Sequence, residues 1–383
     1  MQEEIKLKNN IFKFAKKELS QDAFISWLIN YINTDEDKYK KEAKKFISML
    51  CNKTENERLI YYINNNDYKV DIKLQYKKID ILLIIGEFYI IIEDKILTKE
   101  HNDQIKRYRS ELIKTKVPKS NIFIFYYKMF EEYNNCPNNE YKSITRQDMI
   151  KFLDAITNKN MILEDYYKYL MEIEKYSRKR DVIAKEINKI KSNEVDNIQG
   201  AIYTGFYGEL EKEGKNIEGW GYADNKSGGT WWYSSEMYKN IISNDYERIY
   251  AEINLKDNRN YIILKLAKKC KEIKLDKNTE KKLEIKKYKY DKEKDIYKCY
   301  KILKNNVDIY NKVVTKKFLD ILKKYDIKED NENSKGKIKK SKTNNYKYYA
   351  RIANINIDNY NLDEIKNILK DIDSYIKNIR IKI

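Results

Sequence analysis

Residues 78–95, KIDILLIIGEFYIIIEDK, constrain the fold more than any other stretch of the sequence. Two runs rich in Ile, Leu, Phe and Tyr flank Gly86 and Glu87, which predicts strands at 78–85 and 88–95 joined by a two-residue loop. Gly at the first loop position suits a type II′ turn, and a two-residue loop fixes the register. Asp80 then lies opposite Glu93, with Cβ atoms roughly 4.5–5.5 Å apart on one face.

The charged residues of this hairpin fall on two faces. Lys95 shares the face of Asp80 and Glu93, whereas Asp94 points to the opposite face, because strand side chains alternate. Two facing carboxylates repel each other, so the hairpin is destabilised unless a positive group lies between them. A divalent metal ion with oxygen ligands would offset the repulsion, with Lys95 beside it. The alternative is a solvated strand end at which Lys95 pairs with one carboxylate.

The same charged residues resemble a family signature. Asp80, followed by Glu93-Asp94-Lys95 after a strand, is similar to the D…(D/E)xK signature of the PD-(D/E)xK nuclease superfamily. One departure is Ile79, which stands where many members have proline.

Two flanking motifs extend the resemblance to about residues 10–150. Residues 104–108, QIKRY, are similar to the QxxxY motif that follows the signature in many members. Residues 18–28, ELSQDAFISWL, resemble the opening helix of one bacterial branch, which occurs largely among restriction-like and phage-defence proteins.

The resemblance implies an α/β fold with a restriction-endonuclease-like core, in which helices flank a mixed central sheet. It also implies hydrolysis of phosphodiester bonds with Mg²⁺ or Mn²⁺ as cofactor. Asp80 and Glu93 would bind the metal, a carbonyl from Asp94 would join them, and Lys95 would position or activate the attacking water.

Three more residues receive roles from the resemblance. Gln104 would orient the site and Tyr108 would brace it, because positions i and i+4 share one helix face. Glu18 would lean over the metal from the first helix. The alternative for Gln104 and Tyr108 is an exposed helix with a half-buried tyrosine. The alternative for Glu18 is capping of the first helix, which is also the role that we expect for Asp22.

Hydrophobic periodicity predicts the elements around the hairpin in the order α-α-β-β-β-α-β-α. Ser20 is the expected N-cap of the first helix and Thr145 of the last. Residues 52–66 form a polar stretch between the second helix and the first strand. The expected helices are 20–32, 37–51, 102–114 and 145–156, and the expected strands beside the hairpin are 68–76 and 121–127. Apolar residues on both faces of the hairpin predict helices on both sides of the sheet.

The remaining sequence predicts a helical connector at 161–196 and a smaller basic α+β domain at 197–383, after a nuclease-like domain at 1–160. A polar stretch at 328–345 predicts a mobile basic loop. Trp220, Trp231 and Trp232 lie in a predicted strand region, where we expect them in the core rather than stacked on bases.

Charge is distributed unevenly along the chain. Residues 251–383 hold 36 Lys and Arg against 20 Asp and Glu, whereas residues 1–250 hold 42 against 40. This asymmetry indicates a polyanionic partner, nucleic acid, and we expect DNA before RNA. The alternative is the lysine-rich codon usage of an AT-rich genome.

Composition also argues against several classes of protein. No run of 18 apolar residues and no apolar signal segment at the start occur, so we expect a cytoplasmic protein without a membrane partner. Four scattered cysteines and a single histidine, His101, argue against a zinc or iron–sulfur site. The sequence leaves open a homodimer, an RNase, and a nuclease-like module that binds nucleic acid or a partner without cutting.

Overall fold

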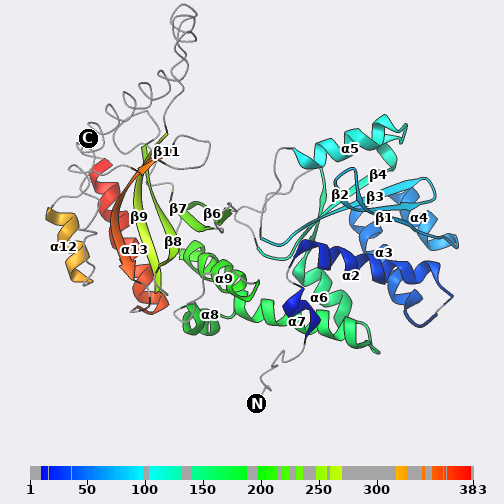
Figure 1. Ribbon diagram of the computed structural model, residues 1–383, viewed down its shortest axis with the longest axis horizontal. Helices are drawn as coiled ribbons and strands as arrows, with labels where there is room; N and C mark the ends of the chain where they lie inside the picture. The colour runs from blue at the N-terminus through cyan, green and yellow to red at the C-terminus, as the bar shows by residue number, and fades with distance from the viewer. Residues whose placement is uncertain are drawn as a thin grey trace, which may run out of the picture. The chain divides into compact units, whose positions relative to one another are not determined.

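The computed structural model describes most of the first half of the chain and separate segments of the second half (Figure 1). The described residues are 10–15, 17–35, 37–97, 103–131, 140–187, 197–213, 217–223, 230–235, 247–256, 259–269, 316–325, 339–340, 347–356, 358 and 360–380. The chain divides into two compact units. One comprises Met1–Lys179 with Val195–Gly205, and the other comprises Arg180–Glu194 with Phe206–Ile383.

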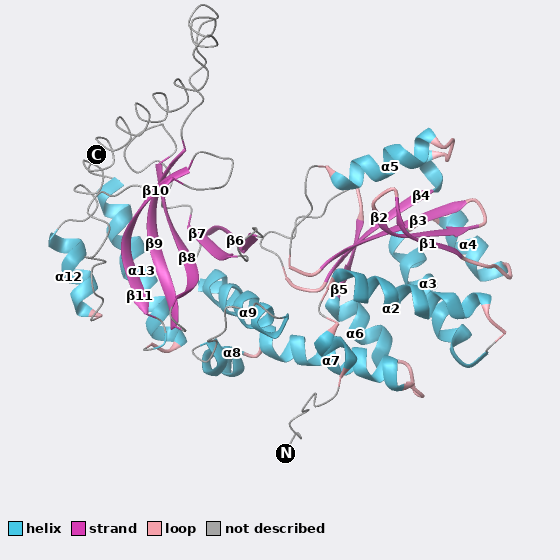
Figure 2. Cartoon of the chain, in the orientation of Figure 1, coloured by secondary structure: helices cyan, strands magenta, loops and turns pink. Residues whose placement is uncertain are grey.

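A five-stranded mixed sheet forms the centre of the first unit (Figure 2). Its spatial order follows the chain, and β1, β2 and β3 are antiparallel whereas β3, β4 and β5 are parallel. The strands are β1 (Asp71–Tyr76), β2 (Ile79–Ile85), β3 (Phe88–Lys95), β4 (Ile122–Lys128) and β5 (Lys142–Thr145).

The register of the central hairpin is the predicted one. Ile85 pairs with Phe88 and Ile81 with Ile92, an offset that places Asp80 across from Glu93. Gly86 has φ +57°, the left-handed conformation that a type II′ turn requires at its first central position. Helix α5 (Gln104–Lys114), expected at 102–114, then carries the chain from β3 to the parallel strand β4.

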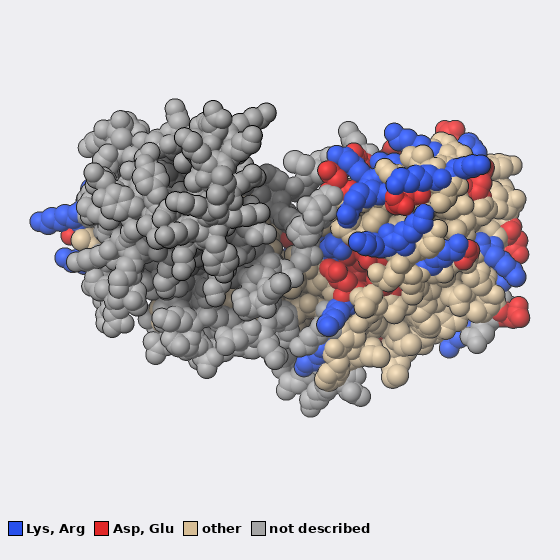
Figure 3. Space-filling view, turned by 45° about the horizontal axis from the view of Figure 1, so that its top comes forward, with Lys and Arg blue, Asp and Glu red and all other residues tan. Residues whose placement is uncertain are grey.

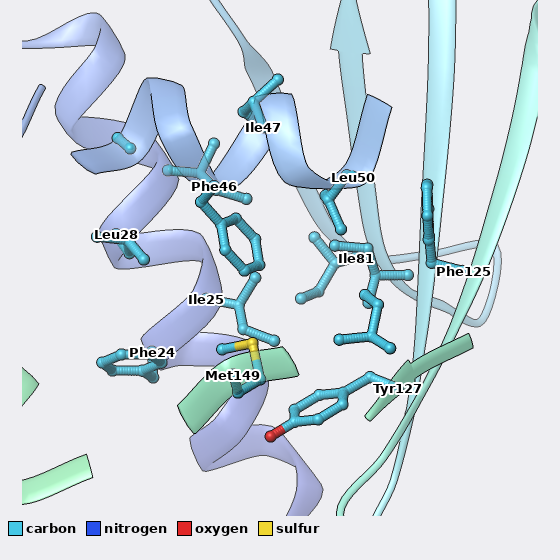
Figure 4. Packing of buried hydrophobic residues seen from close by; sticks show 14 of the residues in the cluster. Phe24, Ile25, Leu28, Phe46, Ile47, Leu50, Ile81, Phe125, Tyr127 and Met149 are labelled. Carbon is cyan, nitrogen blue, oxygen red and sulfur yellow. The ribbon is translucent and has the colours of Figure 1, made fainter. Parts of the chain in front are cut away.

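Helices cover both faces of this sheet (Figure 1). One face packs on α2, α3, α6 and α7 through the main core, part of which Figure 4 shows. The other face packs on α5 through a smaller core that includes Ile91, Ile105 and Leu112. The remaining elements of the first unit are α1 (Ile11–Phe14), α2 (Glu18–Asn30), η1 (Tyr31–Asn33), α3 (Asp37–Thr54), α4 (Glu57–Asn65), η2 (Lys119–Asn121), α6 (Arg146–Asp154) and α7 (Met161–Arg178).

Two predictions about helices in this unit were wrong. Helix α2 begins at Glu18, two residues before the expected cap Ser20, and its N-cap residue Lys17 makes no side-chain capping bond. The polar stretch 52–66 contains helix α4, because Leu59 and Ile63, four residues apart, bury one side of it. The predicted cap of α6 is confirmed, since Thr145 and Asp148 form a reciprocal capping box.

The second unit contains a six-stranded sheet in the order β10-β11-β9-β8-β7-β6, antiparallel at every pairing. Its strands are β6 (Ile217–Ala223), β7 (Thr230–Ser235), β8 (Glu247–Lys256), β9 (Arg259–Lys269), β10 (Lys339–Lys340) and β11 (Lys347–Asn356). The helices described after α7 are α8 (Arg180–Glu186), α9 (Asn197–Glu213, which begins in the first unit and contributes Ala201 to its core), α12 (Lys316–Lys324) and α13 (Leu362–Arg380).

Two of the three neighbouring tryptophans lie in the core of the second unit, as predicted. Trp220 and Trp231 are buried, and Trp220 stacks on the ring of Tyr207. Apart from β10, the loop predicted at 328–345 lies outside the described residues. Within the described part of the chain, no helix combines the length and apolar character needed to cross a membrane.

Candidate active site

Lys95, the last residue of β3, lies among carboxylates from three elements. Its Nζ lies 2.6 Å from Glu93 Oε1 on the same strand, 3.8 Å from Asp80 Oδ2 on β2, and 3.7 Å from Glu18 Oε2 on α2. It also donates a hydrogen bond of 2.9 Å to the carbonyl oxygen of Asp94. The structure therefore brings together the predicted acidic residues and the predicted lysine around one ammonium group.

Backbone N–H groups hold two of these carboxylates in place. The N–H of Asp94 donates to Asp80 Oδ2 at 3.1 Å, which ties the start of β2 to the end of β3. The N–H of Ile96 donates to Glu18 Oε1 at 3.2 Å, which ties the first turn of α2 to the residue after β3. Glu18 thus points to the end of the hairpin, and its other oxygen contacts Lys95.

Glu93 is the most deeply enclosed of the three carboxyl groups. Its side chain has no exposed surface, and its Oε2 atom is buried without a hydrogen-bond partner. Burial and then the nearby Asp80 charge raise the pKa of Glu93 to about 8, although Lys95 opposes the rise. For Lys95, burial alone would lower the pKa, but the charge and hydrogen bond of Glu93 raise it above its ordinary value. The ammonium therefore stays charged while Glu93 titrates near neutral pH.

The first turns of helix α5 bring Gln104 and Tyr108 to the same carboxylate. Gln104 Nε2 donates to Glu93 Oε1 at 2.5 Å and also to the hydroxyl of Tyr108. Tyr108 is 2% exposed, so the alternative of a half-buried tyrosine on an exposed helix was wrong. Burial raises the pKa of the Tyr108 hydroxyl, which keeps it neutral and able to donate a hydrogen bond.

Asp94 lies on the opposite face of β3, as alternation predicted. Gln21 of α2 donates from Nε2 to Asp94 Oδ1 at 2.5 Å, and both side chains are buried. Burial, and then the charges of Asp22 and Glu18, raise the pKa of Asp94 well above its ordinary value. The Asp94 side chain therefore anchors α2 to β3, and only its carbonyl oxygen faces Lys95.

Asp22 is not a capping residue, contrary to expectation. It lies inside helix α2, is 2% exposed, and its Oδ2 atom accepts a hydrogen bond of 3.5 Å from Gln75 Nε2. Burial and then the charges of Asp80 and Glu18 raise the pKa of Asp22 to about 7. Because α2 begins at Glu18, the residue four positions later points inward rather than at the helix N-terminus.

Gln75 is a site residue that the sequence analysis missed. Its Nε2 atom lies 3.2 Å from Asp80 Oδ1, and its φ of +51° is uncommon for a residue with a side chain. On either side of it, Leu74 pairs with Ile81 and Tyr76 pairs with Ile79, so Gln75 lies across from Asp80. The register of the β1–β2 hairpin was the available signal, because it places an amide opposite the first carboxylate.

The donor atoms suit a hard divalent cation. Among the described residues, Glu93, Asp94, Asp22 and Gln21 each have one buried side-chain oxygen without a hydrogen-bond partner. Carboxylate and amide oxygens are the ligands that Mg²⁺ prefers. Within the described ranges, no group of three His, Cys, Asp or Glu side chains has metal-ligating geometry. In this arrangement the Lys95 ammonium compensates the carboxylates. His101 lies outside the described residues.

The mixed sheet flanked by helices, with an acid–lysine cluster at the end of its central hairpin, defines a restriction-endonuclease-like α/β core. Residues 9–198 match a family described as the PD-(D/E)XK nuclease superfamily. This part of the chain therefore belongs to that superfamily, which confirms the resemblance and extends it beyond residue 150. Neither the curated proteins nor the solved structures that were searched gave a match.

Proposed function

We propose that this protein is a metal-dependent nuclease that hydrolyses phosphodiester bonds of nucleic acid. One observation carries the proposal: the Lys95 ammonium lies 2.6 Å from Glu93 and 3.8 Å from Asp80, at the end of the hairpin. A buried lysine held between two carboxylates is suited to position a water molecule and to stabilise the negative charge that develops at a phosphate. The superfamily membership of residues 9–198 supports the same reaction class.

Each residue of the cluster has a role consistent with its position. Asp80 and Glu93 would hold Mg²⁺ or Mn²⁺, with the carbonyl oxygen of Asp94 as a further ligand. When bound, the cation would act as a Lewis acid that activates water and neutralises charge on the phosphate. Lys95 would position the water and stabilise negative charge at the phosphate, since its raised pKa keeps it cationic.

The surrounding polar groups would keep Glu93 in a productive orientation. Gln104 donates to Glu93 Oε1 and to the Tyr108 hydroxyl, so it fixes the carboxylate plane against the buried tyrosine. Glu18 accepts from the Ile96 N–H and contacts Lys95, so it would hold the ammonium from the side of α2. These contacts support positioning roles for Gln104 and Tyr108 and an electrostatic role for Glu18.

We propose DNA rather than RNA as the substrate, and restriction or phage defence as the role. Both proposals rest on the resemblance to the bacterial branch with the ELSQDAF helix. A second candidate is a nuclease-like module that binds nucleic acid or a partner without cutting. The presence of Asp80, Glu93 and Lys95 together argues against that candidate, because a silent copy usually loses one of them.

A cleavage assay tests the proposal. Purified protein is incubated with single-stranded DNA, double-stranded DNA or RNA in Mg²⁺, Mn²⁺ or EDTA, beside the Glu93→Ala and Lys95→Ala variants. We expect metal-dependent cutting that both variants lose. Cutting that persists in EDTA would contradict the metal mechanism. Retained binding without cutting under every condition would favour the binding module.

A further inference from the structure

A surface groove next to the carboxylate cluster is lined mainly by basic side chains. It lies between the β1–β2 turn and the outer side of helix α5. Its basic residues are Lys77, Lys78, Lys106, Arg107 and Lys114, and we call it the basic groove. Figure 3 shows lysine and arginine side chains gathered on one face of the first unit, around a smaller group of acidic side chains.

The turn that presents two of these lysines has an unusual backbone. Lys77 and Lys78 are the two central residues of the β1–β2 hairpin loop, and their φ angles are +51° and +72°. Positive φ at both positions is typical of type I′ turns, which strongly prefer Asn-Gly or Gly-Gly because side chains are disfavoured there. Two lysines at these positions weaken the hairpin, and such local strain commonly marks a functional surface.

The positive charge of the groove is only partly neutralised. Glu111 contacts Lys77 at 3.6 Å and Lys114 at 2.6 Å, and Lys106 contacts Asp103 at 3.1 Å and Glu140 at 3.9 Å. Within the described part of the chain, Lys78 and Arg107 form no ion pair, and both side chains are exposed. A guanidinium group presents N–H donors in a fork that matches phosphate oxygens, and an ammonium supplies a compact charge to them. The groove is therefore suited to phosphate groups.

The groove adjoins the candidate active site through Tyr108. Tyr108 is one of the residues that line the groove, and its buried hydroxyl accepts a hydrogen bond from Gln104, which also donates to Glu93. On the other wall, Lys78 precedes Asp80 by two residues on the same hairpin. Phosphates bound along the groove would therefore lie beside the carboxylates at which cleavage is proposed.

We propose that the basic groove holds the phosphodiester backbone of the substrate next to the scissile bond, so that the first unit itself supplies substrate contacts. The inference rests on the proposed function for its substrate class, but it concerns binding and can be tested without cleavage. DNA and RNA share the phosphodiester chemistry, so both are included in the test. The groove makes backbone contacts, which hold the polymer without reading its sequence.

The test measures fluorescence anisotropy of labelled single-stranded DNA, double-stranded DNA and RNA of mixed sequence, in EDTA, over a salt series between about 50 and 200 mM. The groove variant combines Lys77→Asn, Lys78→Gly and Arg107→Ala in the full chain. Asn-Gly suits the positive φ angles, so the turn should keep its fold and the melting temperature should not fall. The matched control is Lys40→Ala, Lys41→Ala and Lys45→Ala, which removes the same charge from a basic surface on α3.

We expect the groove variant to bind at least about tenfold more weakly. The slope of log affinity against log salt should become shallower by about 2 to 3, since each of the three lost phosphate contacts contributes about 0.7 to 0.9 to its magnitude. The α3 control should change much less, and the polymer with the largest loss is the one that the groove holds. Equal affinity and slope in the two variants would overturn the inference. A selective loss of binding in the groove variant, together with a wild-type protein that cuts nothing when metal is added, would uphold the groove and reject the nuclease.

Discussion

Lys95 Nζ lies 2.6 Å from Glu93 Oε1, whereas the second oxygen of Glu93 is buried without a hydrogen-bond partner. The ammonium therefore compensates one oxygen of the carboxyl group and leaves the other oxygen without a partner. Burial of an ion pair costs desolvation free energy, which the attraction between the charges offsets only while both partners are present. Removal of either partner should change stability and catalysis in different ways.

Lys95→Met should reduce cleavage by about a hundredfold to a thousandfold, as expected for loss of one charge that stabilises the transition state. It should also lower the free energy of unfolding by up to about 3–5 kcal/mol above pH 8, because it leaves Glu93 charged and buried. At pH 6 the loss should be smaller, since Glu93, with a pKa of about 8 in the wild type, is already protonated there, and removal of Lys95 raises this pKa further.

Urea denaturation in EDTA at the two pH values measures this effect, and the double variant Glu93→Gln with Lys95→Met is the control. Its neutral pair should recover much of the stability at high pH without recovering cleavage. An equal loss of stability relative to wild type at both pH values would show that Glu93 does not depend on the ammonium.

Gln75 allows stability and positioning to be separated at one position. Gln75→Gly and Gln75→Ala both remove the amide that lies 3.2 Å from Asp80, so both should lower kcat/KM, by about tenfold for one lost hydrogen bond to a charged group. Their stabilities should differ by about 1 kcal/mol in favour of glycine, because φ is +51° at this position. Steady-state cleavage and urea denaturation measure the two effects, and wild-type kcat/KM in both variants would exclude a positioning role.

The sequence predicted the parts of the fold that local rules determine. A two-residue loop at Gly86 fixed the hairpin register, and alternation then assigned Glu93 and Asp94 to opposite faces, as observed. The parallel crossover followed from a helix placed between two apolar strands. In each case a short-range constraint was sufficient to place residues that lie far apart in the sequence.

The features that the sequence did not predict depend on long-range packing or on unusual backbone geometry. Helix α4, ERLIYYINN, lies within a stretch flanked by polar residues, and contact with the core determines that Leu59 and Ile63 are its buried residues. Gln75 reaches Asp80 through a positive φ that no sequence rule assigns to glutamine. Arg146 is 1% exposed and binds the Met129 carbonyl as well as carboxylates from distant segments, a role that its place after a helix cap does not reveal.

Asp94→Asn should be tolerated at neutral pH. Burial raises the pKa of Asp94 well above its ordinary value and so favours the neutral acid, which an amide of the same shape should replace with little loss of stability. Gln21→Ala should instead lower the free energy of unfolding by about 1–3 kcal/mol, because it leaves Asp94 Oδ1 buried without its donor. Urea denaturation at pH 7 compares the two, and a larger loss for Asp94→Asn than for Gln21→Ala would show that Asp94 is charged in the folded protein.

Asp22 should make the metal-free protein less stable as the pH rises. Its pKa is raised from 3.8 to about 7 in the folded protein, so the folded state binds more protons than the unfolded state between these values. The contribution of Asp22 to the free energy of unfolding is therefore complete below about pH 4 and is lost as pH rises to about 7. Asp22→Asn removes this contribution. The free energy of unfolding of the wild type minus that of the variant, measured in EDTA, should therefore decrease over the same pH interval. A constant or rising difference would show that the Asp22 pKa is not raised.

Glu93 should control cation affinity, and the thermal shift on adding Mn²⁺ or Mg²⁺ measures this without any substrate. A bound cation stabilises the folded protein, so the melting temperature of wild type should rise with metal concentration. Glu93→Gln should abolish the shift, whereas Asp67→Asn, at an exposed carboxylate, should keep it. Because the metal binds the ionised carboxylate, affinity should increase up to about tenfold per pH unit and level off above pH 8.

Lys95→Met adds an independent arm to this experiment. The ammonium and a divalent cation repel each other beside Glu93, so removal of the ammonium should strengthen metal binding although it weakens cleavage. A merely structural defect in Lys95→Met would instead weaken both. An identical thermal shift in wild type and Glu93→Gln would place the cation away from the end of the hairpin and would contradict the assignment of Glu93 as a ligand.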